Sequence, residues 1–250
     1  MSGADGSRHE GRNGGLAYLP GLDGLRALAV AAVVAFHFGA GWATGGFLGV
    51  SLFFTLSGFL ITRVLLAERS ADGHVRLRGF WGRRIRRLTP AAMVCLAGVL
   101  VVMAVRGDAG HARQVGHDVL ASAFNVANWH FVSSSVSYGD LFSGWRSPVL
   151  HFWSLAIEEQ FYVLFPVLFV VVARWHDRLD RRGLDRRGLD RRGRRWRSAP
   201  AVVAVTVVGA ILASVVASWL TADGDLVYFG THTRAGELLI GVLLALAVEA

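Results

Sequence analysis

The stretch FLGVSLFFTLSGFLITRVLL, residues 47–66, decides the class of fold. It is 20 residues long and contains a single charged side chain, Arg63. A helix rises about 1.5 Å per residue, so about 20 apolar residues cross the roughly 30 Å hydrocarbon layer of a membrane. We therefore predict that this stretch is a membrane-spanning helix, and the same test applies to the chain on either side of it.

Five other stretches have a comparable length and apolar character. They are residues 19–42, 88–105, 152–173, 199–220 and 231–248. The short turn around Gly45 and Gly46 joins the first two spans of the chain, which predicts an antiparallel hairpin. The sequence thus predicts an all-α fold, a polytopic integral membrane bundle with about six transmembrane helices.

The composition agrees with a membrane protein. Hydrophobic residues make up 53% of the chain and charged residues only 18%, whereas soluble domains carry about 25% charged residues. The net charge of +8 would suit a nucleic-acid binder, but 19 of the 26 basic residues fall in residues 63–87 and 174–197. Both segments adjoin apolar spans, as cytoplasmic loops do. We therefore expect the lipid bilayer, and not nucleic acid, as a partner.

The same arginines predict an orientation. If the N-terminus is cytoplasmic, the loop after the second span carries eight Arg and the loop after the fourth carries eleven, both inside. This distribution obeys the positive-inside rule, so we predict a multi-pass protein of the cell (plasma or inner) membrane with a cytoplasmic N-terminus.

The remaining segments are assigned from composition. Residues 1–15 are polar and Gly-rich and are expected to be disordered, while residues 16–250 form the membrane domain. Within that domain, residues 174–198 are predicted to be an Arg-rich cytoplasmic loop. Three copies of LDRRG at residues 179–193 favour a solvated, disordered linker near lipid headgroups.

The outer segment contains a moderately apolar stretch, residues 119–132, that is too short to cross the membrane. We expect it to form a re-entrant or surface-lying helix. Asn125, Asn128 and Trp129 suit a position at the membrane interface.

Ionisable residues inside apolar spans are costly and mark candidate functional sites. Arg26 and His37 are 11 residues apart in the first span, so they share a helix face at about 16 Å along the axis. Asp23 lies one turn before Arg26 and is placed to neutralise it. His37 is either a general base, because its ordinary pKa is near neutrality, or a structural hydrogen-bond partner of a neighbouring helix.

The fourth span begins with HFWSLAIEEQFY, residues 151–162. Ser154 and Glu158 are four residues apart and share a face, whereas Glu159 points about 100° away. A carboxylate this far inside the membrane needs a partner. Glu158 either orients His37 or forms a polar clamp between helices.

Two further groups of charged residues have two interpretations each. Arg234 and Glu237 are three residues apart and can pair on one helix face, or Arg234 can stabilise an oxyanion or hold an anionic substrate. Four arginines before the third span can bind the phosphates of a donor molecule, although membrane topology alone also produces such a cluster. These four are Arg83, Arg84, Arg86 and Arg87.

Other kinds of site find no support in the sequence. There is no Cys/His spacing typical of a metal site and no Gly-rich nucleotide-binding loop, so we expect no metal and no bound cofactor. The single cysteine, Cys95, excludes an intramolecular disulfide.

Taken together, five motifs resemble the membrane-bound acyltransferase family 3. They are LDGLRALAV at residues 22–30, continuing to His37, and the stretches at residues 49–62, 83–90, 151–166 and 233–241. The resemblance implies a membrane enzyme, an O-acyltransferase that carries out O-acetylation. Such an enzyme takes an acyl group, often acetyl, from acyl-CoA as donor substrate and passes it to a hydroxyl of a sugar, glycolipid or cell-surface polymer, a carbohydrate modification.

By position, the resemblance also implies roles for single residues. Arg26 and His37 match the family's Arg–His motif, and Glu158 its later carboxylate, so we expect His37 to be the base and Glu158 to orient it. Arg84 and Arg87, with Arg83 and Arg86 beside them, would bind acyl-CoA. Arg234 matches the family's later arginine, and we expect it to contact the substrate or its oxyanion, together with Ser154 and His151.

Two other functions stay open at this stage. A transporter or flippase for a lipid-linked or acylated substrate would also use ionisable residues inside the membrane. The family domain usually contains more helices than the six expected here, so an inactive truncated member is the other alternative. Further helices would then come from a partner protein or from a homo-oligomer.

Overall fold

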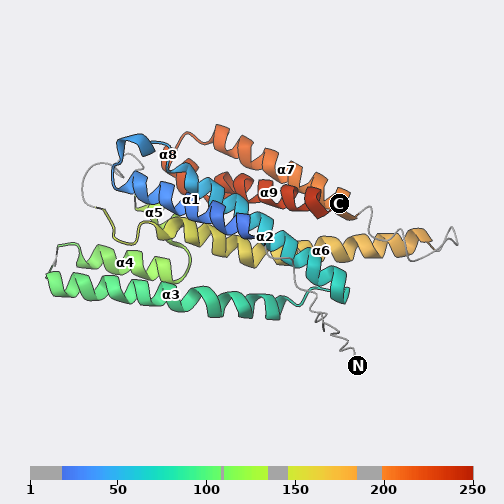
Figure 1. The fold of residues 1–250 in the computed structure, drawn as a ribbon, viewed down its shortest axis with the longest axis horizontal. Helices are drawn as coiled ribbons and strands as arrows, with labels where there is room; N and C mark the ends of the chain where they lie inside the picture. The colour runs from blue at the N-terminus through green and yellow to red at the C-terminus, as the bar shows by residue number, and fades with distance from the viewer. Residues whose placement is uncertain (1–18, 108–109, 135–145, 185–198, 250) are drawn as a thin grey trace, which may run out of the picture.

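The computed structural model describes residues 19–107, 110–134, 146–184 and 199–249, and these residues form helices and turns without a strand (Figure 1). Six helical segments are long and apolar enough to cross a membrane, which confirms the predicted fold class. They are α1 (Pro20–His37), α2 (Leu48–Asp72), α3 (Leu77–Arg106), α6 (Phe152–Leu184), α7 (Ala199–Leu220) and α9 (Thr231–Glu249), the last preceded by the short α8 (Gly224–Phe229).

The first two helices form the predicted antiparallel hairpin, but the first is shorter than expected. α1 ends at His37, and a 3-10 turn at Gly41–Ala43 leads into α2. Trp42 therefore lies in the connection, where its side chain is 85% exposed. The shorter helix places His37 in the last turn of α1, at one end of the bundle.

The most extensive helix pair among the described elements is α2 with α9. Two glycines allow it. A Cβ atom added to Gly58 would collide with the backbone of Leu238, and one added to Gly241 would collide with the carbonyl oxygen of Thr55. Small residues that let two backbones approach are typical of membrane helix interfaces. α6 packs against this pair and contributes many of the buried aromatic residues.

The remaining long helices are less enclosed. In α1 only Ala29 is buried, and in α3 only Phe80 and Leu96 are. α3 contacts α6 and the short helix α4 (Ala112–Ala123). Because their outward faces are apolar, we expect them to face lipid.

The short outer stretch differs from the prediction. It contains α4 and a second helix, α5 (Ala127–Ser133), separated by Asn125 in a left-handed conformation with φ of 56°. Asn128, for which we predict an interfacial position, is fully buried within the protein. Its amide donates to the Phe229 carbonyl and to the Thr231 hydroxyl, each at 3.0 Å, and accepts from Gln160 at 2.9 Å. These bonds remove the cost of burying the amide.

The two Arg-rich segments begin at the same end of the bundle. Arg69 near the end of α2 donates twice to Asp177 of α6, at 2.9 and 3.0 Å. α6 continues as a helix to Leu184, so the first LDRRG copy is helical and not a loop as predicted. The other copies and the N-terminal segment 1–15 lie outside the described residues.

Candidate active site

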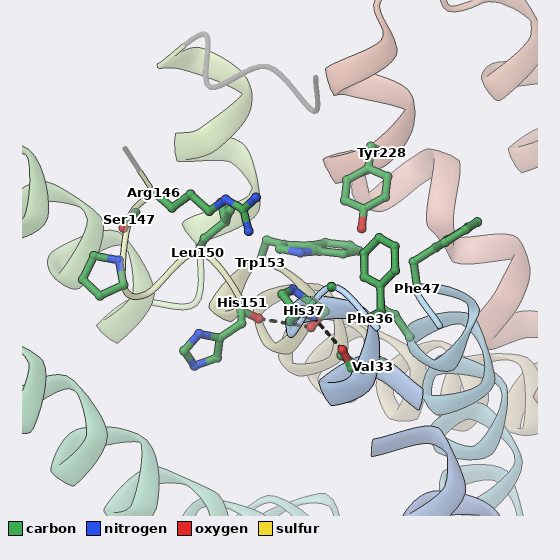
Figure 2. A pocket seen from close by; sticks show the side chains of 14 residues that line it. Val33, Phe36, His37, Phe47, Arg146, Ser147, Leu150, His151, Trp153 and Tyr228 are labelled. Atoms are coloured by element: carbon green, nitrogen blue, oxygen red, sulfur yellow. Dashed lines mark hydrogen bonds between the residues drawn. The ribbon is translucent and has the colours of Figure 1, made fainter. Parts of the chain in front are cut away.

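A pocket of about 380 Å³ opens at the end of the bundle opposite the Arg69–Asp177 pair. It lies where the end of α1, the beginning of α2, the beginning of α6 and α8 meet (Figure 2). The polar and aromatic side chains that line it are His37, Phe36, Phe47, Arg146, Ser147, His151, Trp153, Ser154 and Tyr228. The sequence predicted three of these as site residues, namely His37, His151 and Ser154.

His37 has a defined hydrogen bond at the pocket wall. Its Nδ1 atom lies 2.7 Å from the carbonyl oxygen of Val33, one turn earlier in α1. A carbonyl oxygen can only accept, so Nδ1 carries the proton and Nε2 of the neutral ring has a free lone pair. The ring of Phe36 packs edge-on against the imidazole. This arrangement leaves one basic nitrogen of His37 available at the pocket.

His151 and Ser154 belong to the turn that starts α6 and line the same pocket. The Ser154 hydroxyl donates to the His151 carbonyl at 3.2 Å. His151 lines the edge of the pocket and is exposed. Desolvation by the surrounding protein, and to a smaller extent the nearby His37, lower its pKa below the ordinary value of 6.5. Near neutral pH His151 is therefore uncharged.

The aromatic wall of the pocket was not predicted. The rings of Trp153 and Tyr228 lie 4.8 Å apart, and Figure 2 shows both beside Phe36, with Arg146 on the other side of Trp153. Trp153 stands inside a recognised motif, but exposed and half-exposed aromatic residues near span ends are also typical of membrane interfaces. Nothing in the sequence distinguishes the two situations.

Arg234 lies behind this wall and not among the residues that line the pocket. Its guanidinium is 5.0 Å from the ring centroid of Tyr228 and 5.7 Å from that of Trp153. The predicted pair with Glu237 is confirmed at 2.6 Å, and Ser51 of α2 donates to the same carboxylate at 3.0 Å. The geometry therefore supports a role in bracing the wall more than direct contact with an oxyanion.

Glu158 does not pair with His37, contrary to the prediction. It accepts hydrogen bonds from Ser57 of α2 and from Tyr162, each at 3.0 Å, and it does not line the pocket. Periodicity placed Glu158 and Ser154 on one face of α6 but could not show that Glu158 lies one turn deeper, beside α2. The alternative interpretation, a polar clamp between helices, describes its contacts.

The four arginines of α3 separate into two groups. Arg84 turns inward, with its guanidinium 3.1 Å from the ring centroid of Tyr162. Arg83, Arg86 and Arg87 are exposed, and a loose 3.8 Å pair joins Arg83 to the carboxylate of Glu68. None of the four lines the pocket.

Arg26 is also separate from the pocket. It pairs with Asp23 at 3.9 Å, as predicted, and lies 11 residues before His37 in α1. The structure therefore places Arg26 about 16 Å from His37 along the helix axis. A direct role for both residues on the same substrate atom does not fit this separation.

The fold and the pocket define a multi-pass helical membrane protein with a histidine at the rim of a partly aromatic pocket. Residues 19–249 match the family described as "Acyltransferase domain". The chain belongs to this family, which confirms the resemblance found in the motifs.

The chain is also similar to longer curated proteins. It is 41% identical over 234 residues to the peptidoglycan O-acetyltransferase OatA of Listeria monocytogenes, an alignment that covers 91% of this chain and 34% of the relative. It is 42% identical over 229 residues to YrhL of Bacillus subtilis, which carries a provisional name for the same activity, with 92% and 33% covered. The chain thus spans about a third of the length of these relatives. No solved structure matches the chain significantly.

Proposed function

We propose that this chain is the membrane domain of an O-acyltransferase that transfers an acyl group, most simply acetyl, from acyl-CoA to a hydroxyl of a cell-wall glycan. The observation that carries the proposal is the state of His37. Its Nδ1 is hydrogen-bonded to the Val33 carbonyl and its ring lines the pocket, so Nε2 is the basic nitrogen whenever the ring is neutral. Membership in the acyltransferase family supports the type of reaction, and similarity to a peptidoglycan O-acetyltransferase supports a glycan as the acceptor.

In the proposed reaction, Nε2 of His37 removes the proton of the acceptor hydroxyl as its oxygen attacks the thioester carbonyl. The new ester C–O bond forms, the C–S bond breaks, and the proton passes from His37 to the departing thiolate. A positioned base of this kind contributes about a hundredfold to ten-thousandfold in rate. Because the hydrogen bond to Val33 fixes the tautomer, the base needs no rearrangement before the reaction.

The pocket suits a sugar as the acceptor. Its volume of about 380 Å³ lies in the range of small-molecule sites, roughly 300 to 1,000 Å³. Trp153 and Tyr228 offer flat apolar surfaces, and Ser154, Ser147 and Arg146 offer polar groups at its edge. An apolar wall with a few polar groups fits a ring that has one C–H face and several hydroxyls.

The donor is proposed to enter from the other end of the bundle. Arg83, Arg86 and Arg87 are exposed there on α3, and arginine binds phosphate through paired N–H donors. The pocket residue Ser154 and the deeper Tyr162 are eight residues apart on α6, about 12 Å along the helix. If the phosphates of acyl-CoA are bound at the cytoplasmic end, the part of the donor that carries the thioester must extend at least this distance through the bundle to reach His37.

Membrane orientation follows from the same proposal. Both Arg-rich segments begin at the end of the bundle held by Arg69 and Asp177, so this end is proposed to be cytoplasmic. The pocket then opens on the outer face, where a cell-wall glycan is found. The donor and the acceptor would thus approach from opposite sides of the membrane.

The test uses membranes that contain the chain and acyl-labelled CoA, with cell-wall glycan present. Label should pass to the glycan in the wild type and not in His37→Ala. His74→Ala is the matched control, because His74 is exposed at the opposite end, where its ring is hydrogen-bonded to the nearby Asp72 carbonyl. Equal transfer by wild type and His37→Ala would refute the assignment of the base. Movement of an acylated lipid across the membrane without transfer would favour a transporter.

A further inference from the structure

Arg84 differs from the other arginines of its run because it lies inside the bundle. Its guanidinium lies 3.1 Å from the ring centroid of Tyr162, well within the range of a cation–π contact. Trp81, one turn earlier in α3, donates to the Tyr162 carbonyl at 3.0 Å. These two contacts fix α3 against α6 at this level of the bundle, and they direct the charge of Arg84 away from the surface.

The hydroxyl at the far end of the Tyr162 ring contacts the carboxylate of Glu158. The Tyr162 hydroxyl donates to Glu158 at 3.0 Å, and Ser57 donates to the other oxygen of the same carboxylate at 3.0 Å. Arg84 interacts electrostatically with both Glu158 and its neighbour Glu159. One cation is therefore electrostatically coupled to two acidic side chains in the membrane-spanning part of α6.

This charge balance argues against a phosphate ligand at Arg84. An anion beside Arg84 would be attracted by the guanidinium and repelled by each of the two glutamates that is ionised, and such forces are strong where water is scarce. The polar atoms of the cluster that lack a hydrogen-bond partner among the described residues are Arg84 Nε and Glu159 Oε1. They are one donor and one acceptor on neighbouring helices, and no hydrogen bond joins them in the structure.

We propose that Arg84 is the internal counter-charge of Glu158 and Glu159, a positioning residue for α6, and not a ligand of the donor phosphates. Glu158 lies one turn from Ser154 in the pocket wall, so the cluster sets the place of the pocket-forming end of α6. Donor phosphates are then bound by the exposed arginines, with Arg87 the first candidate. This inference rests on the proposed acyl transfer from acyl-CoA.

A suppression experiment on the full chain in lipid vesicles tests the inference. The variants are Arg84→Gln, Glu158→Gln, the double variant Arg84→Gln/Glu158→Gln, and Arg87→Gln. Asp177→Asn is the control, because it removes a carboxylate paired with Arg69 at the end of the bundle. The readouts are the thermal unfolding midpoint and the kcat and KM for labelled acetyl-CoA.

Arg84→Gln leaves two carboxylates without their counter-charge, so it should lower the unfolding midpoint and kcat with little change in KM. Adding Glu158→Gln relieves part of the repulsion, and the double variant should recover at least fivefold in kcat, about 1 kcal/mol. Arg87→Gln should instead raise the KM for acetyl-CoA about tenfold with kcat nearly unchanged.

The inference is overturned if Arg84→Gln raises KM as Arg87→Gln does and Glu158→Gln fails to suppress the defect, because Arg84 would then bind the donor. It is also overturned if the midpoint of Arg84→Gln equals that of the wild type. Absence of transfer by the wild type would refute the proposed function instead. In that case the unfolding midpoints alone still decide whether the three charges are coupled.

Discussion

Arg234 is bound to Tyr228 from two directions. Its Nε atom donates to the Tyr228 carbonyl at 3.1 Å, while its guanidinium lies 5.0 Å from the Tyr228 ring centroid. The ion pair with Glu237 holds the other end of the guanidinium. A residue of α9 therefore fixes both the backbone and the ring of a residue that lines the pocket.

Arg234→Lys tests this bracing. Lysine keeps the positive charge beside Glu237 but lacks the planar group that stacks on a ring and donates in two directions. We expect the KM for the glycan acceptor to rise about tenfold, about 1.4 kcal/mol, with the KM for acyl-CoA unchanged. Arg63→Lys, which alters a similar pair with Glu249, is the control. A loss of kcat alone would instead indicate that Arg234 contacts the reacting atoms.

Gly241→Ala tests the close approach of α2 and α9. An added Cβ at this position meets the backbone of Thr55, which no side-chain rotation can relieve. We expect the free energy of unfolding to fall by about 1–3 kcal/mol, measured by thermal unfolding in detergent micelles. Gly98→Ala is the matched control because a Cβ there meets no atom within 4 Å. Equal stability of both variants would contradict the described packing.

The runs of apolar residues predicted the spans well because the hydrocarbon layer of a membrane requires helices with apolar side chains, which hydropathy measures. It could not predict helix ends outside the hydrocarbon layer. α2 continues past residue 66 to Asp72, and α3 begins at Leu77, well before residue 88. In these extensions the helices carry charged side chains, which are stable in contact with water or headgroups. The hydropathy therefore falls while the helix continues.

The site was predictable only along single helices. Motif and periodicity placed His37 and Ser154 at a site, and both line the pocket. The partner of Glu158 could not be predicted because helix periodicity gives a face and not the neighbouring helix. Ser57 and Tyr162, its observed partners, required the packing of α2 against α6 to be known.

His37→Asn separates the structural from the chemical role of this histidine. The asparagine amide nitrogen can occupy the place of Nδ1 and donate to the Val33 carbonyl, but the variant has no counterpart of Nε2. We expect kcat to fall by about a hundredfold or more, with an unchanged unfolding midpoint and unchanged acceptor binding. If His37 were only structural, His37→Asn would keep most of the activity and His37→Ala would lower the unfolding midpoint.

The lowered pKa of His151 predicts a dependence of stability on pH. Desolvation, assisted by His37, lowers the pKa of the folded state below the ordinary value of 6.5. Between these two values the unfolded chain binds more protons than the folded chain, so the free energy of unfolding falls as the pH falls. This loss is absent above 6.5 and complete below the pKa of the folded state.

His151→Gln removes the titrating ring. The unfolding midpoint of this variant should therefore rise relative to that of the wild type as the pH is lowered below 6.5. Thermal unfolding at several pH values on either side of that point measures the difference. Because His37 contributes to the lowered pKa, the pH-dependent gain should shrink when both proteins also carry His37→Asn. If the wild type and His151→Gln lose stability in parallel as the pH falls, His151 is not desolvated at the pocket edge. The pocket would then be more open to water than its lining residues indicate.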